Sequence, residues 1–318
     1  MEWKKLGKVF QVNGEGGWMH SHAQIPAALV LDDRIRVYFA TRPQRNLSLT
    51  TFVDLDRNDP TKVIALNEQP VLQPGPAGAF DEHGIMPSCV IKKGKQVWLY
   101  YGGWSRRENI RYSNWTGIAV SDDDGATFHR MFPGPVVDRT PNEIYSATAV
   151  FVLPEGERMH MWYARGLGWF EVNGQLEEVY RLRYGHSSDG IHWTRPDQEL
   201  VPWLREHEPT HRPTVIRLGD RYHMWFCHRG IADFRGGDQA YRMGYAWSTD
   251  ALTWHRDDAQ AGLTVSPGQW DSDMVAYPYV VKVDAPAGAS AKEGDRVLMF
   301  YNGNGFGVSG FGVAELVR

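Results

Sequence analysis

Five short clusters of polar residues each stand directly before a strand-like segment, and four of these clusters contain acidic side chains. Two carboxyl groups that face a sugar across one pocket can cleave a glycosidic bond: one protonates the leaving oxygen, and the other activates water or attacks directly. Neighbouring carboxylates and partial burial can keep one of the two protonated near neutrality. The acidic candidates are Asp81, Glu82, Glu143, Asp271 and Asp273, with Glu208 behind them. The alternative for each is a structural salt bridge to an arginine.

Other polar and aromatic side chains in or near these clusters are suited to binding sugar hydroxyl groups and ring faces. The residues that we expect to bind substrate are His22, Gln24, Glu82, His83, Trp104, Tyr145, Arg165, His211, Arg212 and Asp271. A solvated loop rim would also be polar, so the recurrence of five such clusters in register is the stronger signal.

The elements that must position these residues recur along the whole chain. Five aromatic-rich strands align on Phe39, Tyr101, Tyr163, Phe226 and Tyr301, with steps of 62, 62, 63 and 75 residues. A fixed period of this length is typical of repeat architectures. The last step is longer because the small-residue stretch 284–293 reads as a loop insertion. The repeat predicts an all-β, five-bladed β-propeller in one domain, residues 1–318, with four antiparallel strands per blade.

The second repeat shows the predicted unit most clearly. Segments 86–91, 96–101 and 116–121 read as three short strands separated by turns, and a fourth strand follows at Phe128. The turn between the third and fourth strands begins Ser121-Asp122-Asp123 and recurs at Ser187 and Ser248, where Asx-type side-chain bonds stabilise the bend. We interpret these turns as structural. In a propeller the first strands line the central channel, so the polar clusters should converge there. Val9-Phe10 is expected to complete the last blade and cover its edge strand.

Composition limits the classes of partner. Hydrophobic residues make up 42% of the 318 residues and charged residues 23%, as in ordinary soluble proteins. The net charge of −4, without a basic run, gives no reason to expect nucleic acid or a membrane as partner. No apolar stretch of signal-peptide length follows Met1, and Cys89 and Cys227 read as buried thiols, so we expect a cytoplasmic protein. The oligomeric state stays open.

The repeat, the Ser-x-Asp-Gly turns and the acidic clusters resemble the five-bladed propeller glycosidases of glycoside hydrolase families 43, 32, 68, 117 and 130. The resemblance covers the whole chain at the level of architecture, and it implies a glycosidase acting on a small carbohydrate. In families 43 and 32, blade one supplies an Asp as base or nucleophile, blade two an Asp that tunes, and blade three a Glu as general acid. The resemblance therefore implies catalytic roles for Asp81, in the blade-two place, and Glu143, in the blade-three place.

The blade-one place departs from that pattern, because Ser21-His22-Ala23-Gln24 contains no acid. Asp271 or Asp273 supplies the second carboxylate from across the channel, or His22 acts as base, or the protein binds sugar without catalysis. We carry Asp273 as the third catalytic candidate. A phosphorylase, as in family 130, is another alternative, because phosphate is then the nucleophile; His211, Arg212 and Arg165 would be its phosphate cradle.

Two further readings are weaker. Gln24-Ile25-Pro26 and the Ser-Asp turns resemble sialidase motifs, but Gln replaces the carboxylate-binding Arg and five repeats replace six blades. The twelve histidines show no tight metal-ligand spacing, so we predict no metal and no cofactor, although a channel calcium held by carboxylates and a histidine stays open.

Overall fold

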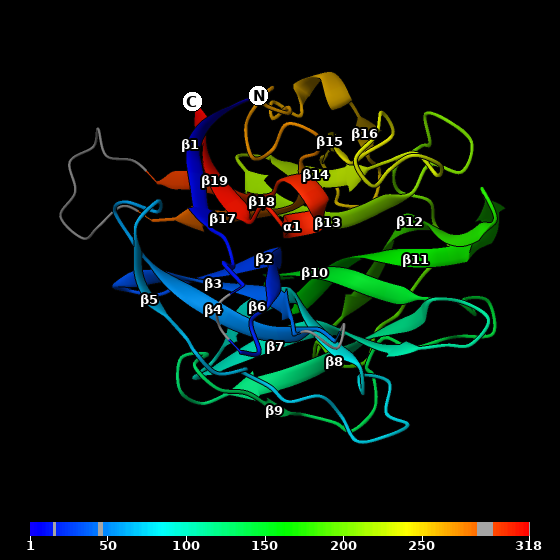
Figure 1. Cartoon of the computed structure of the whole chain (residues 1–318), viewed down its shortest axis with the longest axis horizontal. Helices are drawn as coiled ribbons and strands as arrows, with labels where there is room; N and C mark the ends of the chain where they lie inside the picture. The colour runs from blue at the N-terminus through cyan, green and yellow to red at the C-terminus, as the bar shows by residue number, and fades with distance from the viewer. Residues whose placement is uncertain (15–16, 44–46, 285–294, 318) are drawn as a thin grey trace.

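Five antiparallel sheets fan around a common centre in the computed structural model (Figure 1), which describes residues 1–14, 17–43, 47–284 and 295–317. Blade one contains β2 (Ser21–Val30), β3 (Arg34–Arg42), β4 (Leu49–Asp56) and β5 (Val63–Leu66). Blade two contains β6 (Gly84–Lys93), β7 (Gln96–Arg106), β8 (Tyr112–Ser121) and β9 (His129–Arg130). Blade three contains β10 (Ala147–Glu155), β11 (Arg158–Val172) and β12 (Gln175–Ser187). Blade four contains β13 (Thr210–Leu218), β14 (Arg221–His228), β15 (Arg242–Ser248) and β16 (His255–Arg256). Blade five contains β17 (Ala276–Val283), β18 (Arg296–Asn302), β19 (Phe311–Val317) and β1 (Glu2–Phe10).

The first strands of the blades form a closed ring. Strand β2 contacts β6, β6 contacts β10, β10 contacts β13, β13 contacts β17, and β17 returns to β2. This closure confirms the all-β, five-bladed propeller. In blade three the place of the fourth strand is taken by an isolated bridge between His186 and Thr194. The described residues contain only two short helical segments, η1 (Asp258–Gln260) and α1 (Asn304–Gly307). In the part of the chain that the structure describes, no helix is long and apolar enough to cross a membrane.

The N-terminal strand closes the propeller as predicted. Strand β1 pairs antiparallel with β19, from Glu2 opposite Val317 to Phe10 opposite Phe311, and it covers the edge of blade five. The two chain ends lie next to each other in Figure 1. The predicted insertion 284–293 lies, from residue 285 on, outside the described residues.

Aromatic pairs in the second strands build the core between blades. Adjacent residues of a strand point to opposite faces of its sheet, so a pair of buried neighbours packs against the blades on both sides. The fully buried pairs are Tyr38-Phe39, Tyr100-Tyr101, Trp162-Tyr163, Trp225-Phe226 and Phe300-Tyr301. Cys89 and Cys227 are buried free thiols, as predicted.

The Ser-Asp turns have the structural role that we expected. The Asp123 carboxylate accepts hydrogen bonds from the backbone N–H groups of Ala126 (3.1 Å) and Thr127 (2.9 Å), and Ser121 Oγ accepts one from Gly125 (2.8 Å). Equivalent bonds occur in the other two turns, at Ser187 and Ser248. All three turns lie in the connection that follows the third strand of a blade.

A β-bulge in every first strand shapes the channel. The register between first and second strands shifts after Gln24, Pro87, Thr148, His211 and Ala276. In four of the five, the bulged residue has a positive φ: Ile25 (57°), Ala149 (52°), Arg212 (56°) and Tyr277 (53°). Because a bulge bends the strand and re-aims its side chains, residues at these positions turn toward the channel. The five bulges together build the wall of one cavity.

Candidate functional site

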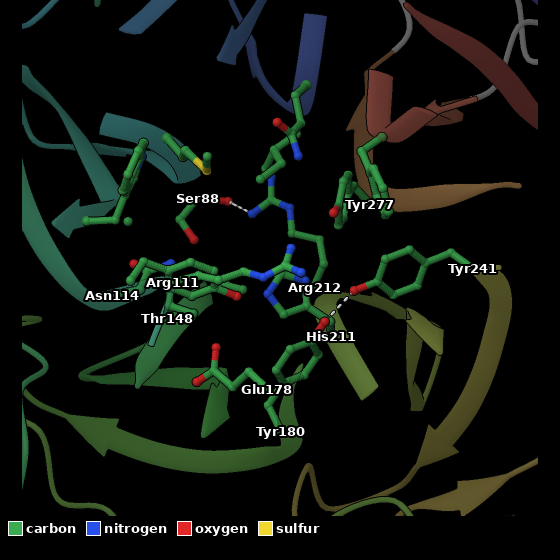
Figure 2. A pocket seen from close by; sticks show the side chains of 18 of the residues that line it. Ser88, Arg111, Asn114, Thr148, Glu178, Tyr180, His211, Arg212, Tyr241 and Tyr277 are labelled. Carbon is green, nitrogen blue, oxygen red and sulfur yellow. Dashed lines mark hydrogen bonds between the residues drawn. The ribbon is translucent and has the colours of Figure 1, made fainter. Parts of the chain in front are cut away.

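A cavity of about 560 Å³ lies where the five bulged first strands converge (Figure 2). Every first strand contributes to its wall, through Gln24, Met86, Thr148, His211 and Tyr277 among others. Much of the remaining wall comes from the ends of β7 and β8, from the β11–β12 hairpin, and from the segment that follows β14, and Arg42 of β3 and Phe306 of α1 complete it.

Glu178, in β12, is one of two buried acids that line this cavity. Its side chain accepts hydrogen bonds from the hydroxyl groups of Ser146 and Tyr112 and is near the guanidinium group of Arg229. Burial raises the pKa of Glu178 from 4.5 to about 7, although these two hydrogen bonds and the Arg229 charge lower it. Only 4% of the residue is exposed. Glu178 is therefore a carboxylic acid that gains and loses its proton near neutral pH.

Local structure explains how Glu178 reaches the cavity. Strands β11 and β12 form a hairpin longer than those of the other blades, paired as far as Val172 opposite Gln175. A register shift between Gly166 and Gly168 displaces the far half of this hairpin. A Cβ atom on Gly166 would lie 2.6 Å from Ser146 Oγ and 2.7 Å from the carboxylate oxygen Oε1 of Glu178. The absence of a side chain at position 166 is what allows the contact between Ser146 and Glu178.

Glu177, the neighbour of Glu178, is held between two arginines. Its carboxylate forms salt bridges with Arg111 (3.1 Å) and Arg235 (2.8 Å). Both partners also line the cavity. Glu177 therefore positions two cationic side chains at the wall of the cavity.

Aromatic rings provide apolar surfaces at the site. Tyr112 and Trp169 pack edge to face with their ring centroids 5.1 Å apart, and Trp104 stacks on the ring of His83 at 6.0 Å. Trp104 also donates a hydrogen bond to Ser48 (2.6 Å), which fixes its orientation. Rings of this kind can stack on the apolar face of a sugar.

A second cavity of about 520 Å³ adjoins the first. The two share Tyr112, Trp169 and Glu178 in their walls. The second cavity is also lined by Trp115 and by the exposed side chains of Ile144 and Tyr145. Glu178 therefore contributes to the walls of both cavities.

The sequence-predicted site residues fall into two groups. Gln24, Trp104, His211 and Arg212 line the first cavity, and Tyr145 lines the second. The predicted residues outside both walls are His22, Asp81, Glu82, His83, Glu143, Arg165, Asp271 and Asp273. The catalytic assignments made from the resemblance thus concern side chains that the structure does not bring into these cavities.

Four of the acids that precede first strands form ion pairs inside their own blades. In each set the acid contacts a side chain from the second strand and a basic residue from the outermost strand or from the segment in its place. The sets are Asp81 with Tyr101 and Arg130, Glu143 with Tyr163 and Arg195, Glu208 with His228 and Arg256, and Asp271 with Tyr301 and Lys5. This recurrence favours the salt-bridge alternative for all four.

The two acids whose catalytic roles the family resemblance implies, Asp81 and Glu143, have short ion-pair distances. Asp81 Oδ2 lies 2.6 Å from the guanidinium group of Arg130 and accepts a hydrogen bond from Tyr101 (3.0 Å). Glu143 lies 2.6 Å from Arg195. Ion pairs of this kind connect the segment before the first strand of a blade to its outermost strand or to the segment in its place. The catalytic roles of Asp81 and Glu143 stay predictions.

The other predicted residues outside the cavities also have local partners. Asp273 is exposed and accepts a hydrogen bond from Ser272 (2.7 Å). Burial, and secondarily the Arg42 charge, lowers the pKa of His22 to about 4, which would leave it a weak base.

The remaining three contact neighbours in the loops. Glu82 accepts a hydrogen bond from the backbone N–H of Gly78 (2.8 Å), and its carboxylate lies 3.4 Å from His83. Arg165 pairs with Asp197 (3.0 Å) and lies 3.7 Å from Glu143. It is not among the residues that line the cavity with His211 and Arg212, so the structure does not bring it into the predicted phosphate cradle. Among the described residues, no group of three or more His, Cys, Asp or Glu side chains is arranged to hold a metal ion.

The residues of the site that sequence reasoning missed are Tyr112, Trp169, Glu177, Glu178, Tyr180 and Arg229. One signal was present: Glu177 and Glu178 interrupt a strand whose next residues, Val179 and Tyr180, are apolar or aromatic. One of two adjacent acids in such a strand must face the interior, because their side chains alternate.

Known proteins resemble this chain in two ways, in amino-acid sequence and in three-dimensional fold. No protein-family model matches the chain. The chain is 35% identical over 318 residues to the uncharacterised protein Rv1502 of Mycobacterium tuberculosis (strain H37Rv), a match that covers 99% of both. Among solved structures, a glycoside hydrolase superposes with a TM-score of 0.72 at 16% identity, covering 98% of this chain and 91% of that one. A thermostable family-43 glycoside hydrolase superposes with a TM-score of 0.66 at 14% identity, covering 97% and 93%. The chain belongs to the family of this mycobacterial protein, and it shares its five-bladed propeller fold with glycoside hydrolases.

Proposed function

We propose that the protein is a glycosidase-type enzyme that cleaves or transfers a glycosyl unit of a small carbohydrate, with Glu178 as the general acid. The observation that carries this proposal is the position of Glu178, a buried carboxyl group in the wall of two adjoining cavities. A glycosidic bond joins two units, and its oxygen needs a proton donor at the junction between them. A sugar in each cavity would place that bond beside Glu178.

The proton affinity of Glu178 suits this task. A general acid works best when its pKa lies near the working pH, because it must hold a proton and also release it. With a pKa of about 7, roughly half of the Glu178 side chains carry a proton at neutral pH. An ordinary exposed glutamate would be almost fully ionised there. The mechanism by which glycosidases raise the pKa of their acid, burial of one carboxyl group, is the one that acts on Glu178.

The walls on either side of Glu178 suit a carbohydrate. Tyr112 and Trp169 belong to both cavities, and Trp104 adds a further ring to the first. Polar side chains such as Gln24, Asn114 and Thr148 line the first cavity together with these aromatic groups. A surface of rings with interspersed hydrogen-bonding groups matches the alternation of apolar faces and hydroxyl groups in a sugar.

One observation favours a second candidate, a protein that binds carbohydrate without cleaving it. Glu177 and Glu178 are the only acids among the described residues of the first wall, and Glu177 is occupied by two arginines. Hydrolysis by the usual mechanism needs a second carboxylate to activate water or to attack. A phosphorylase needs one protein acid only, because phosphate attacks the sugar.

A panel of oligosaccharides, measured by isothermal titration and by a reducing-sugar assay with and without inorganic phosphate, separates these functions. Turnover without phosphate supports a hydrolase, and turnover that requires phosphate supports a phosphorylase. Binding without turnover in either buffer would exclude both and leave the binding protein. Glu178→Gln should lose turnover in the same assay. Its matched control is Glu171→Gln, a residue on the same hairpin that is exposed and outside both walls.

A further inference from the structure

Arg212 presents a buried positive charge to the cavity without a carboxylate partner. It occupies the bulge of β13, is 1% exposed, and donates hydrogen bonds to the backbone carbonyl groups of Ser88 and Pro26 (2.9 Å) across the channel. Among the described residues, no Asp or Glu side chain forms a salt bridge with it. Burial lowers the pKa of Arg212 to about 10, so that the group stays charged at neutral pH.

Arg229, just after β14, is a second buried cation in the same wall. Its guanidinium group donates to the backbone carbonyl groups of Gly230 (2.8 Å) and Glu178 (3.0 Å), and Nε donates to the hydroxyl group of Tyr180 (3.3 Å). No side-chain carboxylate in the described part of the chain forms a salt bridge with it either. Its hydrogen-bond partners are neutral dipoles, and the nearby Glu178 carboxyl group forms no salt bridge with it.

Two buried arginine side chains outside this cavity have carboxylate partners. Arg36 contacts Asp54 at 2.8 Å, and Arg256 contacts Glu208 at 2.7 Å. Removing a charge from water is costly unless an opposite charge or strong hydrogen bonds replace the lost hydration. Arg212 and Arg229 lack such a carboxylate partner, and both lie in the wall of the cavity. An anionic ligand in the cavity could supply the missing negative charge.

Two nitrogen atoms of this wall, one in Arg212 itself and one in its neighbour His211, have no hydrogen-bond partner. Nε of Arg212 and Nδ1 of His211 are both buried and unbonded. Burial, with the charges of Arg212 and Arg229, lowers the pKa of His211 to about 3, so the ring is neutral and one nitrogen can donate. Figure 2 shows His211 and Arg212 at the same wall of the pocket, with Glu178 nearby. Buried groups of this kind are normally satisfied, so their occurrence at a cavity indicates a ligand.

The net charge of the whole wall is also positive. Of the described residues that line the cavity, six are arginines and two are glutamates, while the full chain carries a net charge of −4. This cavity therefore has an excess of positive charge in a protein whose net charge is negative. A concave site with an excess of one sign of charge attracts ligands of the opposite sign.

We propose that the cavity binds an oxyanion, a carboxylate or phosphate group, at Arg212 and His211, and that the natural ligand is an acidic sugar carrying this group. The identification of the carrier as a sugar rests on the proposed function. Arginine is suited to this task because its N–H groups match the geometry of carboxylate and phosphate oxygens. The oxyanion would complete the charge balance of Arg212 and Arg229, and it would orient the sugar relative to Glu178.

The test is isothermal titration of the full chain with glucose, glucuronate, glucose 6-phosphate and inorganic phosphate. At least one acidic sugar should bind about 10- to 100-fold more tightly than glucose, the range expected for hydrogen bonds between charged groups. Arg212→Met should remove that advantage, whereas Arg217→Met, an exposed position on the same strand, should keep it. Inorganic phosphate should compete with the acidic sugar in the unaltered protein, which tests the site even if Arg212→Met fails to fold.

Each outcome is informative. Arg212-dependent binding of phosphate alone, with acidic sugars no tighter than glucose, would confirm the oxyanion site but overturn the acidic-sugar ligand. Absence of Arg212-dependent binding for every anion, or no competition by phosphate, would overturn the inference. Turnover of neutral sugars without any preference for anions would overturn it and leave the proposed function standing. Anion binding without turnover of any sugar would support the inference and contradict the proposed enzymatic function.

Discussion

Replacement of Glu178 by glutamine should produce two effects of opposite sign. The amide keeps the shape of the side chain but has no acidic proton, so turnover should fall by about 10²–10⁴-fold, the usual loss for a general acid. The folded protein, in contrast, should become more stable at alkaline pH. A pKa raised from 4.5 to about 7 means that ionising Glu178 in the folded state costs about 3 kcal/mol more than in the unfolded chain, at about 1.4 kcal/mol per unit.

The pH dependence of this stability follows from linkage. Between pH 4.5 and 7 the folded state holds a proton that the unfolded chain releases, so this group's contribution to stability declines as the pH rises through that window. Above pH 7 the full cost is present, and Glu178→Gln should remove up to about 3 kcal/mol of it. At pH 4 both states are protonated, and the advantage of the variant should vanish.

The assay combines urea unfolding at pH 4 and pH 8 with turnover measured across the same range. Activity of the unaltered protein should fall as the pH rises above about 7, because the acid then loses its proton. Glu171→Gln should match the unaltered protein in both measurements. Full activity of Glu178→Gln, or a stability difference that is the same at pH 4 and pH 8, would refute the assignment of Glu178 as a buried acid.

Three other perturbations test the structure around this site. Asp81→Asn should destabilise folding by about 1–3 kcal/mol in urea titrations, because the half-buried Arg130 loses its charged hydrogen-bond partner; unchanged stability would contradict the ion-pair role. Gly166→Ala should lower turnover at least about 10-fold while the circular dichroism spectrum stays unchanged, because the new methyl group meets Ser146 and Glu178 and a misplaced catalytic group is costly; retained turnover would contradict that packing. Deletion of residues 1–10 should expose the edge of blade five and promote aggregation in size-exclusion chromatography, and a monodisperse, fully folded product would show that β1 is dispensable.

Much of the fold could be predicted from the sequence because each blade repeats one local pattern. The aromatic pairs that end at Phe39, Tyr101, Tyr163, Phe226 and Tyr301 mark the second strands, and their spacing reveals the number of blades. Closure by the N-terminal strand also follows from the repeat, because blade five would otherwise lack its outermost strand.

The site was harder to predict, because it depends on contacts between distant residues. The acids before the first strands were correctly located along the chain, but their partners Arg130 and Arg195 follow 49 and 52 residues later. Nothing in the local sequence shows that these arginines neutralise them. Glu178 was missed because it belongs to a third strand, which only the long β11–β12 hairpin brings to the cavity.

The bulges illustrate the same limit. Pro26, Pro213 and Pro278 each follow a residue with positive φ, yet the sequence does not show that the preceding side chain turns into the channel. His211 and Arg212 were predicted at the site because of their place before a strand, and the bulge is the physical reason that they reach it.

The most direct test of the account is a crystal structure of the Glu178→Gln variant with an uncleaved oligosaccharide. We predict that the glycosidic oxygen lies within hydrogen-bond distance, roughly 2.6–3.2 Å, of the side chain at position 178, with one sugar in each cavity. A sugar bound elsewhere, with Glu143 or Asp81 at its glycosidic oxygen, would contradict the account and return catalysis to the acids that precede the first strands.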